Sequence, residues 1–218
     1  MTLTLVIGNK NYSSWSMRPW LAMRASNIAF EEVFVPLYTG PADKQRILQF
    51  SHAGKVPVLV DGDVTVWDSL AIIEYLAERF PDAKLWPAER AARAHARSIS
   101  AEMHSGFAAL RNECGMNLHR PVGPVPLSAD GKADIARVQE IWRDCRVRYG
   151  GGGPFLFGAF SGADAMYAPV VHRFRTYAIE VGPEVKSYME TMMALPAFRE
   201  WTEAGLAETL VIEKFENV

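Results

Sequence analysis

The fold of this chain is decided by residues 11–20, which read NYSSWSMRPW. The apolar run over residues 3–7 is typical of a strand, and the run from Trp20 to Ala25 is typical of a helix. Three serines therefore stand at a strand-to-helix turn: Ser13, Ser14 and Ser16. Any of them can cap the helix by accepting a backbone N–H, and any can donate to an anion at the positive helix end. The turn by itself leaves both uses open.

Outward from this turn, the first 80 residues read as strand, helix, strand, helix, strand, strand, helix. We predict a strand over residues 31–37, a helix over 43–50, strands within the β-rich runs over 54–60 and 64–67, and a helix over 70–80. The Asp61-Gly62 pair joins two β-rich runs and predicts a hairpin. Pro57 has no N–H to donate, so it must start its strand or lie at an edge. Residues 1–80 are predicted to form one α/β unit.

The remaining chain carries helical patterns only. Residues 81–87, PDAKLWP, have the composition of a linker. We predict one long helical stretch over 88–118, a helix over 132–149, a helix over 165–177 that Pro169 should kink, and a last helix beginning at Pro196. Ser161 and Asp164 have the spacing of a capping box. Residues 88–218 are predicted to form an all-helical unit.

Composition excludes several classes of function. The 218 residues carry a net charge of −2, without the basic surface that nucleic-acid binding requires. No apolar run reaches the roughly 20 residues that span a bilayer, and the N-terminus lacks a signal-type pattern. Cys114 and Cys145 form no metal-spaced or redox pair, and the five histidines show no ligand spacing. We therefore expect a cytoplasmic protein with no nucleic-acid or membrane partner, no metal and no resident cofactor.

Two further pieces of the α/β unit offer polar groups near the serine turn. Lys55-Val56-Pro57 precedes a strand, and Asp68-Ser69 opens a helix. Together they supply a cation, exposed backbone groups, a carboxylate and a second helix N-terminus. These groups suit a zwitterionic peptide, with anions at the helix ends and an ammonium group at Asp68. The plainer interpretation is that Lys55 is a solvated loop residue and that Asp68 and Ser69 only cap a helix.

The combination of these motifs resembles the soluble glutathione transferase family. Five motifs match in order and spacing: Ser13-Ser14-Trp15-Ser16-x-Arg18, Lys55-Val56-Pro57, Asp68-Ser69, Ser161-x-x-Asp164 and residues 195–201, LPAFREW. The resemblance covers nearly the whole chain and is greatest to the serine-type, zeta-like classes. It implies a thioredoxin-like N-terminal domain, with a cis proline after Val56, followed by an all-α helical C-terminal domain.

The resemblance also implies roles for particular residues. Ser13 would donate its hydroxyl to the glutathione sulfur and favour the thiolate, which is the nucleophile. Val56 would pair its backbone with the cysteinyl part, Lys55 would meet the glycyl carboxylate, and Asp68 and Ser69 would hold the γ-glutamyl end. No cofactor is implied, because glutathione is a co-substrate.

A pocket for the electrophile is expected between the two domains. Its candidate residues are Trp15, Met103, Phe107 and Arg111. The alternative interpretation of Met103 and Phe107 is that they only pack in the hydrophobic core. His104 is expected near this pocket and is a candidate acid for the reaction. Trp15 replaces a cysteine of the isomerase-type zeta motif, and an indole cannot act as a thiol.

The resulting hypothesis is a homodimeric glutathione transferase that adds the thiolate of glutathione to small hydrophobic electrophiles. A glutathione-dependent isomerase of the maleylacetoacetate type, or a peroxidase, would use the same site. A third alternative is a non-catalytic family member that binds hydrophobic ligands or partner proteins.

Overall fold

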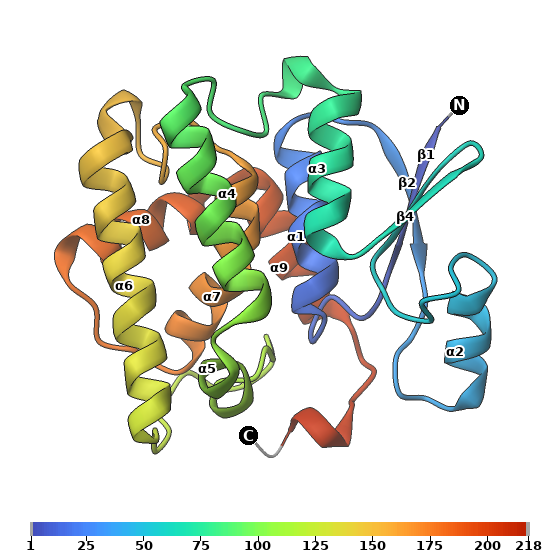
Figure 1. Cartoon of the computed structure of the whole chain (residues 1–218). Helices are drawn as coiled ribbons and strands as arrows, with labels where there is room; N and C mark the ends of the chain where they lie inside the picture. The colour runs from blue at the N-terminus through green and yellow to red at the C-terminus, as the bar shows by residue number, and fades with distance from the viewer. Residues whose placement is uncertain (1, 217–218) are drawn as a thin grey trace.

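The computed structural model describes residues 2–216, so the outermost ends of the two predicted domains (residue 1 and residues 217–218) lie outside the described chain. The N-terminal domain is a four-stranded sheet with three helices (Figure 1). Its elements are β1 (Leu3–Ile7), α1 (Ser14–Ala25), β2 (Phe30–Phe34), α2 (Pro41–Leu48), β3 (Val58–Asp61), β4 (Val64–Trp67) and α3 (Ser69–Arg79). The predicted element order is confirmed.

The sheet has the strand order β2-β1-β3-β4, with β1 parallel to β2 and antiparallel to β3. Alternation along β1 gives the sheet two apolar faces. Leu3, Leu5 and Ile7 belong to the main core that includes α1 and α3, whereas Val6 packs with Ile47 of α2. Figure 1 shows the result: α1 and α3 lie between the sheet and the helical domain, and α2 lies on the outer side.

Residues after the sheet domain form helices and short 3-10 turns, as predicted. The elements are η1 (Pro81–Ala83), α4 (Arg90–Ser105), α5 (Ala108–Glu113), α6 (Ala129–Tyr149), η2 (Gly150–Gly152), α7 (Gly162–Thr176), α8 (Pro183–Ala194), α9 (Pro196–Ala207) and η3 (Glu213–Phe215). No helix within residues 2–216 is long and apolar enough to cross a membrane.

The prediction of one helical stretch over 88–118 is wrong, because the chain turns after α4. Gly106 ends that helix, and Phe107 has a φ of 59°, in the left-handed region. A Cβ on Gly106 would lie only 2.9 Å from the carbonyl oxygen of Glu102, so this turn accepts a glycine and little else. After this break α5 runs in a different direction from α4. Arg111 of α5 thereby lies close to the end of α4, where its Nε–H donates to the Gly106 carbonyl oxygen.

Helix α7 is the centre of the helical domain, and nearly all of its residues are buried. The predicted capping box is confirmed: Asp164 accepts hydrogen bonds from the backbone N–H and the hydroxyl of Ser161, at 2.8 and 2.9 Å. The same helix packs against α1, so one hydrophobic core runs through both domains. Arg18 of α1 crosses this boundary and donates its Nε–H to the Met166 carbonyl oxygen at 3.2 Å. The two domains are therefore held together as one packed body.

Candidate active site

The serine turn forms a short hydrogen-bond chain at the N-terminus of α1. Ser13 is the N-cap residue: its Oγ accepts from the Ser16 N–H at 3.2 Å and lies 2.8 Å from Ser16 Oγ. Ser16 Oγ in turn accepts from the N–H of Gly8 at 3.1 Å, at the end of β1. Ser16 is fully buried, whereas Ser13 and Ser14 each keep about 6% of their surface exposed. The capping use of a serine is thus observed at Ser13.

The Val56-Pro57 segment lies beside this turn. In the antiparallel pairing of β1 with β3, Val58 faces Val6, which places Val56 near Gly8. A Cβ built on Gly8 would lie 3.2 Å from Val56 Cγ2, so the two segments are in contact. The Val56–Pro57 peptide bond is cis, and Pro57 directly precedes β3, as the sequence predicts. Lys55 is exposed.

Asp68 and Ser69 open α3 and reach toward the helical domain. Asp68 Oδ1 caps the helix by accepting from the N–H groups of Leu70 and Ala71, at 2.9 and 3.3 Å. Its φ of 78° is unusual for a residue other than glycine, and such strain is concentrated at functional sites. Asp68 Oδ2 lies 3.2 Å from His104 Nε2 on α4. The Ser69 hydroxyl is buried and has no hydrogen-bond partner within residues 2–216.

Trp15 connects the serine turn to the helical domain. Its indole is 37% exposed, although its neighbours in the turn are buried. The guanidinium carbons of Arg18 and Arg111 lie 4.4 and 4.8 Å from the ring centroid, and the His104 ring lies 5.3 Å away, edge to face. Cations at these distances are attracted to the ring face. Trp15 and Arg111, two of the predicted pocket residues, are therefore brought together.

The other two predicted pocket residues have a different environment. Met103 and Phe107 are buried, at 1% and 7% exposure, within the main hydrophobic core. Their observed environment is the one expected from core packing. The main-chain carbonyl of Met103 nevertheless accepts from Arg111 Nη2, so this part of the chain positions the guanidinium group.

Arg173 was not among the residues predicted from the sequence, and the structure places it next to the serine turn. Its Nη2 lies 3.4 Å from Ser14 Oγ, and its Nη1 donates to the Cys114 and Arg111 carbonyl oxygens. Burial, and then the nearby Arg111, lower the pKa of Arg173 to about 10. The sequence signal that could have identified Arg173 is its position among the apolar residues of α7, a helix that is almost entirely buried.

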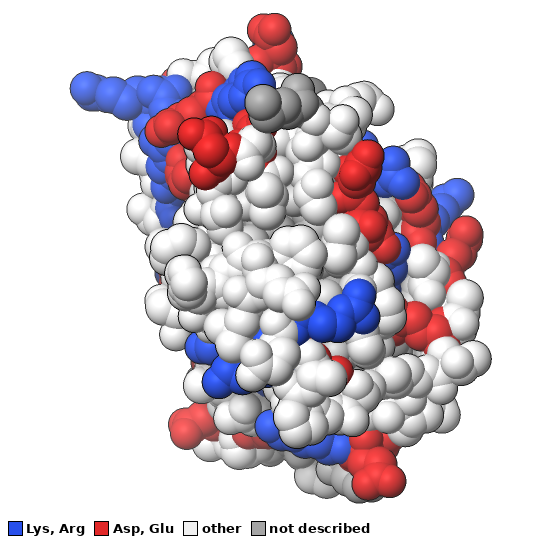
Figure 2. Space-filling view, turned by 90° about the vertical axis from the view of Figure 1, so that its right-hand side faces the viewer, with Lys and Arg blue, Asp and Glu red and all other residues white. Residues whose placement is uncertain are grey.

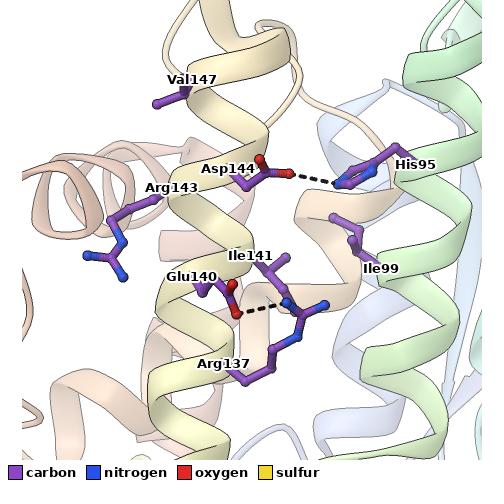
Figure 3. Close-up of a pocket in the computed structure, with 8 residues that line it drawn as sticks. All are labelled: His95, Ile99, Arg137, Glu140, Ile141, Arg143, Asp144 and Val147. Carbon is purple, nitrogen blue, oxygen red and sulfur yellow. Dashed lines mark hydrogen bonds and ion pairs between the residues drawn. The ribbon is translucent and has the colours of Figure 1, made fainter.

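A separate groove between α4 and α6 contains none of these residues. Figure 3 shows the ion pair His95–Asp144 spanning the two helices, at 3.5 Å, and the ion pair Arg137–Glu140 running along α6, at 2.8 Å. The remaining lining residues are Ile99, Ile141, Arg143 and Val147. The fold and the site together define a two-domain protein whose serine turn lies at the N-terminus of α1, next to α7 of the helical domain.

Comparisons with known proteins agree with this class. The family model described as "Glutathione S-transferase, N-terminal domain" matches residues 12–79, and "Glutathione S-transferase, C-terminal domain" matches residues 78–204. The chain therefore belongs to the glutathione S-transferase family. A crystal structure of a glutathione transferase homolog from Burkholderia gl BGR1, with bound glutathione, superposes with a TM-score of 0.73 at 25% identity over 95% of this chain and 100% of that one.

Two curated relatives match the chain over different lengths. Glutathione S-transferase Z2 of Arabidopsis thaliana is 29% identical over 204 residues, which is 87% of this chain and 88% of that protein. A probable maleylacetoacetate isomerase of Caenorhabditis elegans is 43% identical over 101 residues. That match covers 46% of each chain, so this chain spans less than half the length of the worm protein.

Proposed function

We propose that this protein is a glutathione transferase that adds the sulfur of glutathione to an electrophile, with the Ser13 hydroxyl stabilising the thiolate. The observation that carries the proposal is the position of Ser13 Oγ at the N-terminus of α1, within a hydrogen-bond chain that ends at Gly8. Hydroxyl protons rotate to suit their partners. When a thiolate is bound, Ser13 can turn its proton to the sulfur while Ser16 donates to Ser13.

The energies involved are sufficient for this role. A free thiol has a pKa of about 8.5, and lowering it by two units requires about 2.7 kcal/mol of preference for the thiolate. One hydrogen bond to a charged acceptor supplies about 1.5–3 kcal/mol, and a helix N-terminus adds several tenths more. The thiol proton passes to solvent, and the sulfur then attacks the electrophile. Neither a metal nor a resident cofactor is part of this proposal.

The glutathione peptide is proposed to bind along the sheet domain. Val56 would pair its backbone with the cysteinyl part, and the exposed Lys55 would meet the glycyl carboxylate. Asp68 and Ser69 would hold the γ-glutamyl end of glutathione. The ammonium group of that end would contact the Asp68 carboxylate, and its carboxylate would lie at the N-terminus of α3. The buried Ser69 hydroxyl supports this assignment, because its hydrogen-bonding capacity is otherwise unused within the described chain.

A second candidate function is glutathione-dependent isomerisation of the maleylacetoacetate type. It is favoured by the relative from Caenorhabditis elegans, whose name states that activity. Trp15 argues for the transferase, because it replaces the cysteine of the isomerase-type motif. A peroxidase reaction would use the same thiolate and is a third outcome of the assay below. The non-catalytic alternative has no support among the relatives.

We also propose that the protein is a cytoplasmic homodimer. Figure 2 shows a broad uncharged area on the face of the sheet domain. Trp67 and Val64 of β4 are 55% and 40% exposed, and Val147 beside the groove of Figure 3 is 84% exposed. Apolar surface of this kind favours association.

The dimer is tested by measuring the molecular mass by sedimentation. The wild-type protein should have twice the mass of the chain, and the Trp67→Glu variant should have the mass of the monomer. A monomeric wild-type protein would contradict the proposed dimer.

The transferase is tested by turnover of an aryl halide, an organic hydroperoxide and a cis-enone, each with glutathione. We expect the aryl halide to be conjugated, and Ser13→Ala to lower kcat about tenfold or more and to raise the pKa of bound glutathione. The pKa is measured from the ultraviolet absorbance of the thiolate. Unchanged turnover and an unchanged pKa in Ser13→Ala would overturn the role of this serine.

A further inference from the structure

The segment after α9 leaves the helical domain and returns to the loops of the sheet domain. It comprises residues 208–216, includes η3, and is the red segment that leads to the label C in Figure 1. Glu208 accepts from the backbone N–H groups of Lys10 and Asn11, at 2.7 and 3.1 Å. Ile212 is only 4% exposed. We refer to residues 208–216 as the strap.

The strap contacts Tyr12, the residue before Ser13. The Tyr12 hydroxyl donates to Glu216 Oε1 at 2.5 Å and accepts from the Ile212 N–H at 3.3 Å. The ring centroids of Tyr12 and Phe215 are 5.7 Å apart. Burial, and then the hydrogen bond to Glu216, raise the pKa of Tyr12, so its hydroxyl keeps the proton that it donates. The strap therefore runs directly beside the serine turn.

The strap also contacts Tyr38, in the loop that follows β2. Phe215 packs edge to face against Tyr38, with ring centroids 5.4 Å apart. Lys214 Nζ lies 5.3 Å from the ring centroid of Tyr38 and 5.7 Å from that of Phe215. Tyr38 is 63% exposed and has a φ of 62°, which is strained for a bulky residue. Two aromatic rings thus hold the ammonium group of Lys214 at an exposed position.

The charge of Lys214 is not paired with a carboxylate. Within residues 2–216, Lys214 takes part in none of the ion pairs that lysine or arginine forms with aspartate or glutamate. Glu216 is two positions away in the chain, but its Oε1 accepts from the Tyr12 hydroxyl and from Asn117 Nδ2 at 3.0 Å. The described part of the chain therefore positions a cation beside Tyr38 and supplies no counter-charge for it.

The rings that hold this cation lie at the same edge of the sheet domain as Lys55. Segments 37–38 and 55–56 meet at Gly8, because a Cβ built there would lie within 3.2 Å of a side chain in each. Tyr38 and Lys55 both belong to this meeting point, and Lys55 is the residue proposed to meet the glycyl carboxylate. The strap thus runs from the serine turn, where the sulfur is proposed to bind, to the edge proposed for the glycyl end.

We infer that the strap is part of the glutathione site and that Lys214 is a second cation for the glycyl carboxylate, beside Lys55. The inference rests on the proposed function, in which glutathione is the thiol substrate. A lysine that is already held over two rings loses less rotamer freedom on binding than a free surface lysine does. The strap thereby makes the protein selective for thiols that carry a carboxylate at this end.

The strap fits the glycyl end of glutathione better than the γ-glutamyl end. The γ-glutamyl end is assigned to the start of α3, where Asp68 Oδ2 lies 3.2 Å from His104 Nε2 of α4. The contacts of the strap with the sheet domain are instead made at residues 10–12 and at Tyr38. Neither of these belongs to α3 or α4.

The test compares glutathione with its glycyl ethyl ester, which keeps the thiol and the γ-glutamyl end but lacks the glycyl charge. Titration calorimetry measures the Kd of each thiol without an electrophile. We expect wild type to bind glutathione about tenfold or more tightly than the ester, because two lysines contact the carboxylate. Equal affinities for the two thiols would overturn the role of Lys214.

Variants then assign part of this preference to Lys214. Lys214→Met should weaken the binding of glutathione about threefold to tenfold, as expected for a partly exposed charge-assisted contact, and change the Kd of the ester less than about twofold. Lys214→Arg should stay close to wild type, because arginine keeps the charge and also stacks on aromatic rings. Lys186→Met is the matched control, since Lys186 is exposed on α8. An equal loss for both thiols in Lys214→Met would assign the effect to the fold and overturn the inference.

Tyr12→Phe tests whether the strap positions Lys214. This change removes the hydroxyl that binds the strap and keeps the ring that packs against Phe215. Hydrogen exchange of residues 212–216 should accelerate, and the preference for glutathione over the ester should fall toward that of Lys214→Met. Faster exchange with an unchanged preference would show that the strap is not part of the site.

Failure of this inference and failure of the proposed function give different results. If wild type conjugates the aryl halide but binds both thiols equally, the transferase stands and the role of the strap falls. If it binds neither thiol and conjugates nothing, both fall. Binding of glutathione that is selective and depends on Lys214, without turnover of any electrophile, would support the strap and overturn the transferase.

Discussion

Asp68 Oδ2 of the sheet domain lies 3.2 Å from His104 Nε2 of the helical domain. Asp68 uses its other carboxylate oxygen to cap α3, so one side chain fixes a helix start and a contact between domains. His104 also packs edge to face against Trp15. The proposed γ-glutamyl site and the proposed electrophile pocket are therefore linked by two side-chain contacts.

Asp68 can be tested for binding apart from its capping role. Asp68→Asn keeps an oxygen that can cap α3 but loses the negative charge proposed to hold the ammonium group. We expect it to elute from immobilised glutathione well before wild type, with little change in stability. Asp68→Ala should elute early and also lose about 1 kcal/mol, the usual value of an N-cap. Retention of both variants equal to wild type would remove Asp68 from the site.

The three serines should differ in their effects on catalysis. Ser16→Ala removes the acceptor of the Gly8 N–H and should cost about 1–3 kcal/mol of stability, with a smaller fall in kcat than Ser13→Ala. Ser14→Ala removes only the long contact to Arg173 and should affect kcat least. Urea unfolding and steady-state kinetics measure the two effects. A larger loss of kcat in Ser14→Ala or Ser16→Ala than in Ser13→Ala would assign the sulfur contact to another serine.

His172 should make the protein sensitive to acid. It is buried against Phe198, with ring centroids 4.3 Å apart, and burial, then the charge of Arg175, lowers its pKa to about 3. In the unfolded chain histidine becomes protonated near pH 6.5, whereas in the folded protein His172 stays neutral down to about pH 3. The free energy of unfolding is therefore unaffected by His172 above pH 6.5 and decreases as the pH falls from 6.5 toward 3. At pH 5 the loss is about 2 kcal/mol.

The measurement is urea unfolding of His172→Gln and wild type at pH 7 and pH 5. The variant should lose about 2 kcal/mol less than wild type between these values. Burial raises the pKa of Asp164 to about 6, which acts in the opposite sense but equally in both proteins. His52→Gln, at an exposed position, is the control and should follow wild type. Identical pH dependence in His172→Gln and wild type would contradict the prediction.

Glu208 should stabilise the loop that carries the serine turn. Its carboxylate accepts from the backbone N–H groups of Lys10 and Asn11, at 2.7 and 3.1 Å. Glu208→Ala leaves both donors unpaired and should cost about 1–3 kcal/mol. Hydrogen exchange of residues 9–13 should accelerate relative to the control Glu203→Ala, which lies on α9 and is exposed. Unchanged exchange in this loop would show that Glu208 is not needed to hold it.

Much of the fold followed from local patterns. The Asp-Gly hairpin, the apolar run of β1 and the capping box at Ser161 are each determined by neighbouring residues, so these local patterns were informative. Element ends were less accurate: β2 ends at Phe34 although a strand was predicted to residue 37, and α2 begins at Pro41. The stretch over 88–118, which was predicted as one helix, is divided at Gly106 and Phe107. This division depends on how α4 and α5 pack, and the spacing of apolar residues carries no information about that packing.

The sequence by itself indicated the family, through its resemblance, and the order of the two domains, because the motifs that carry both are formed by residues close together in the chain. The glutathione-binding roles that the resemblance implies stay predictions. Tertiary structure decided that Met103 lies in the core, and that Arg18, Arg111 and Arg173 meet around Trp15. Those arginines are 155 positions apart at their extremes, from Arg18 to Arg173. Their proximity is produced by packing α1 against α7, and no local pattern of charge encodes it.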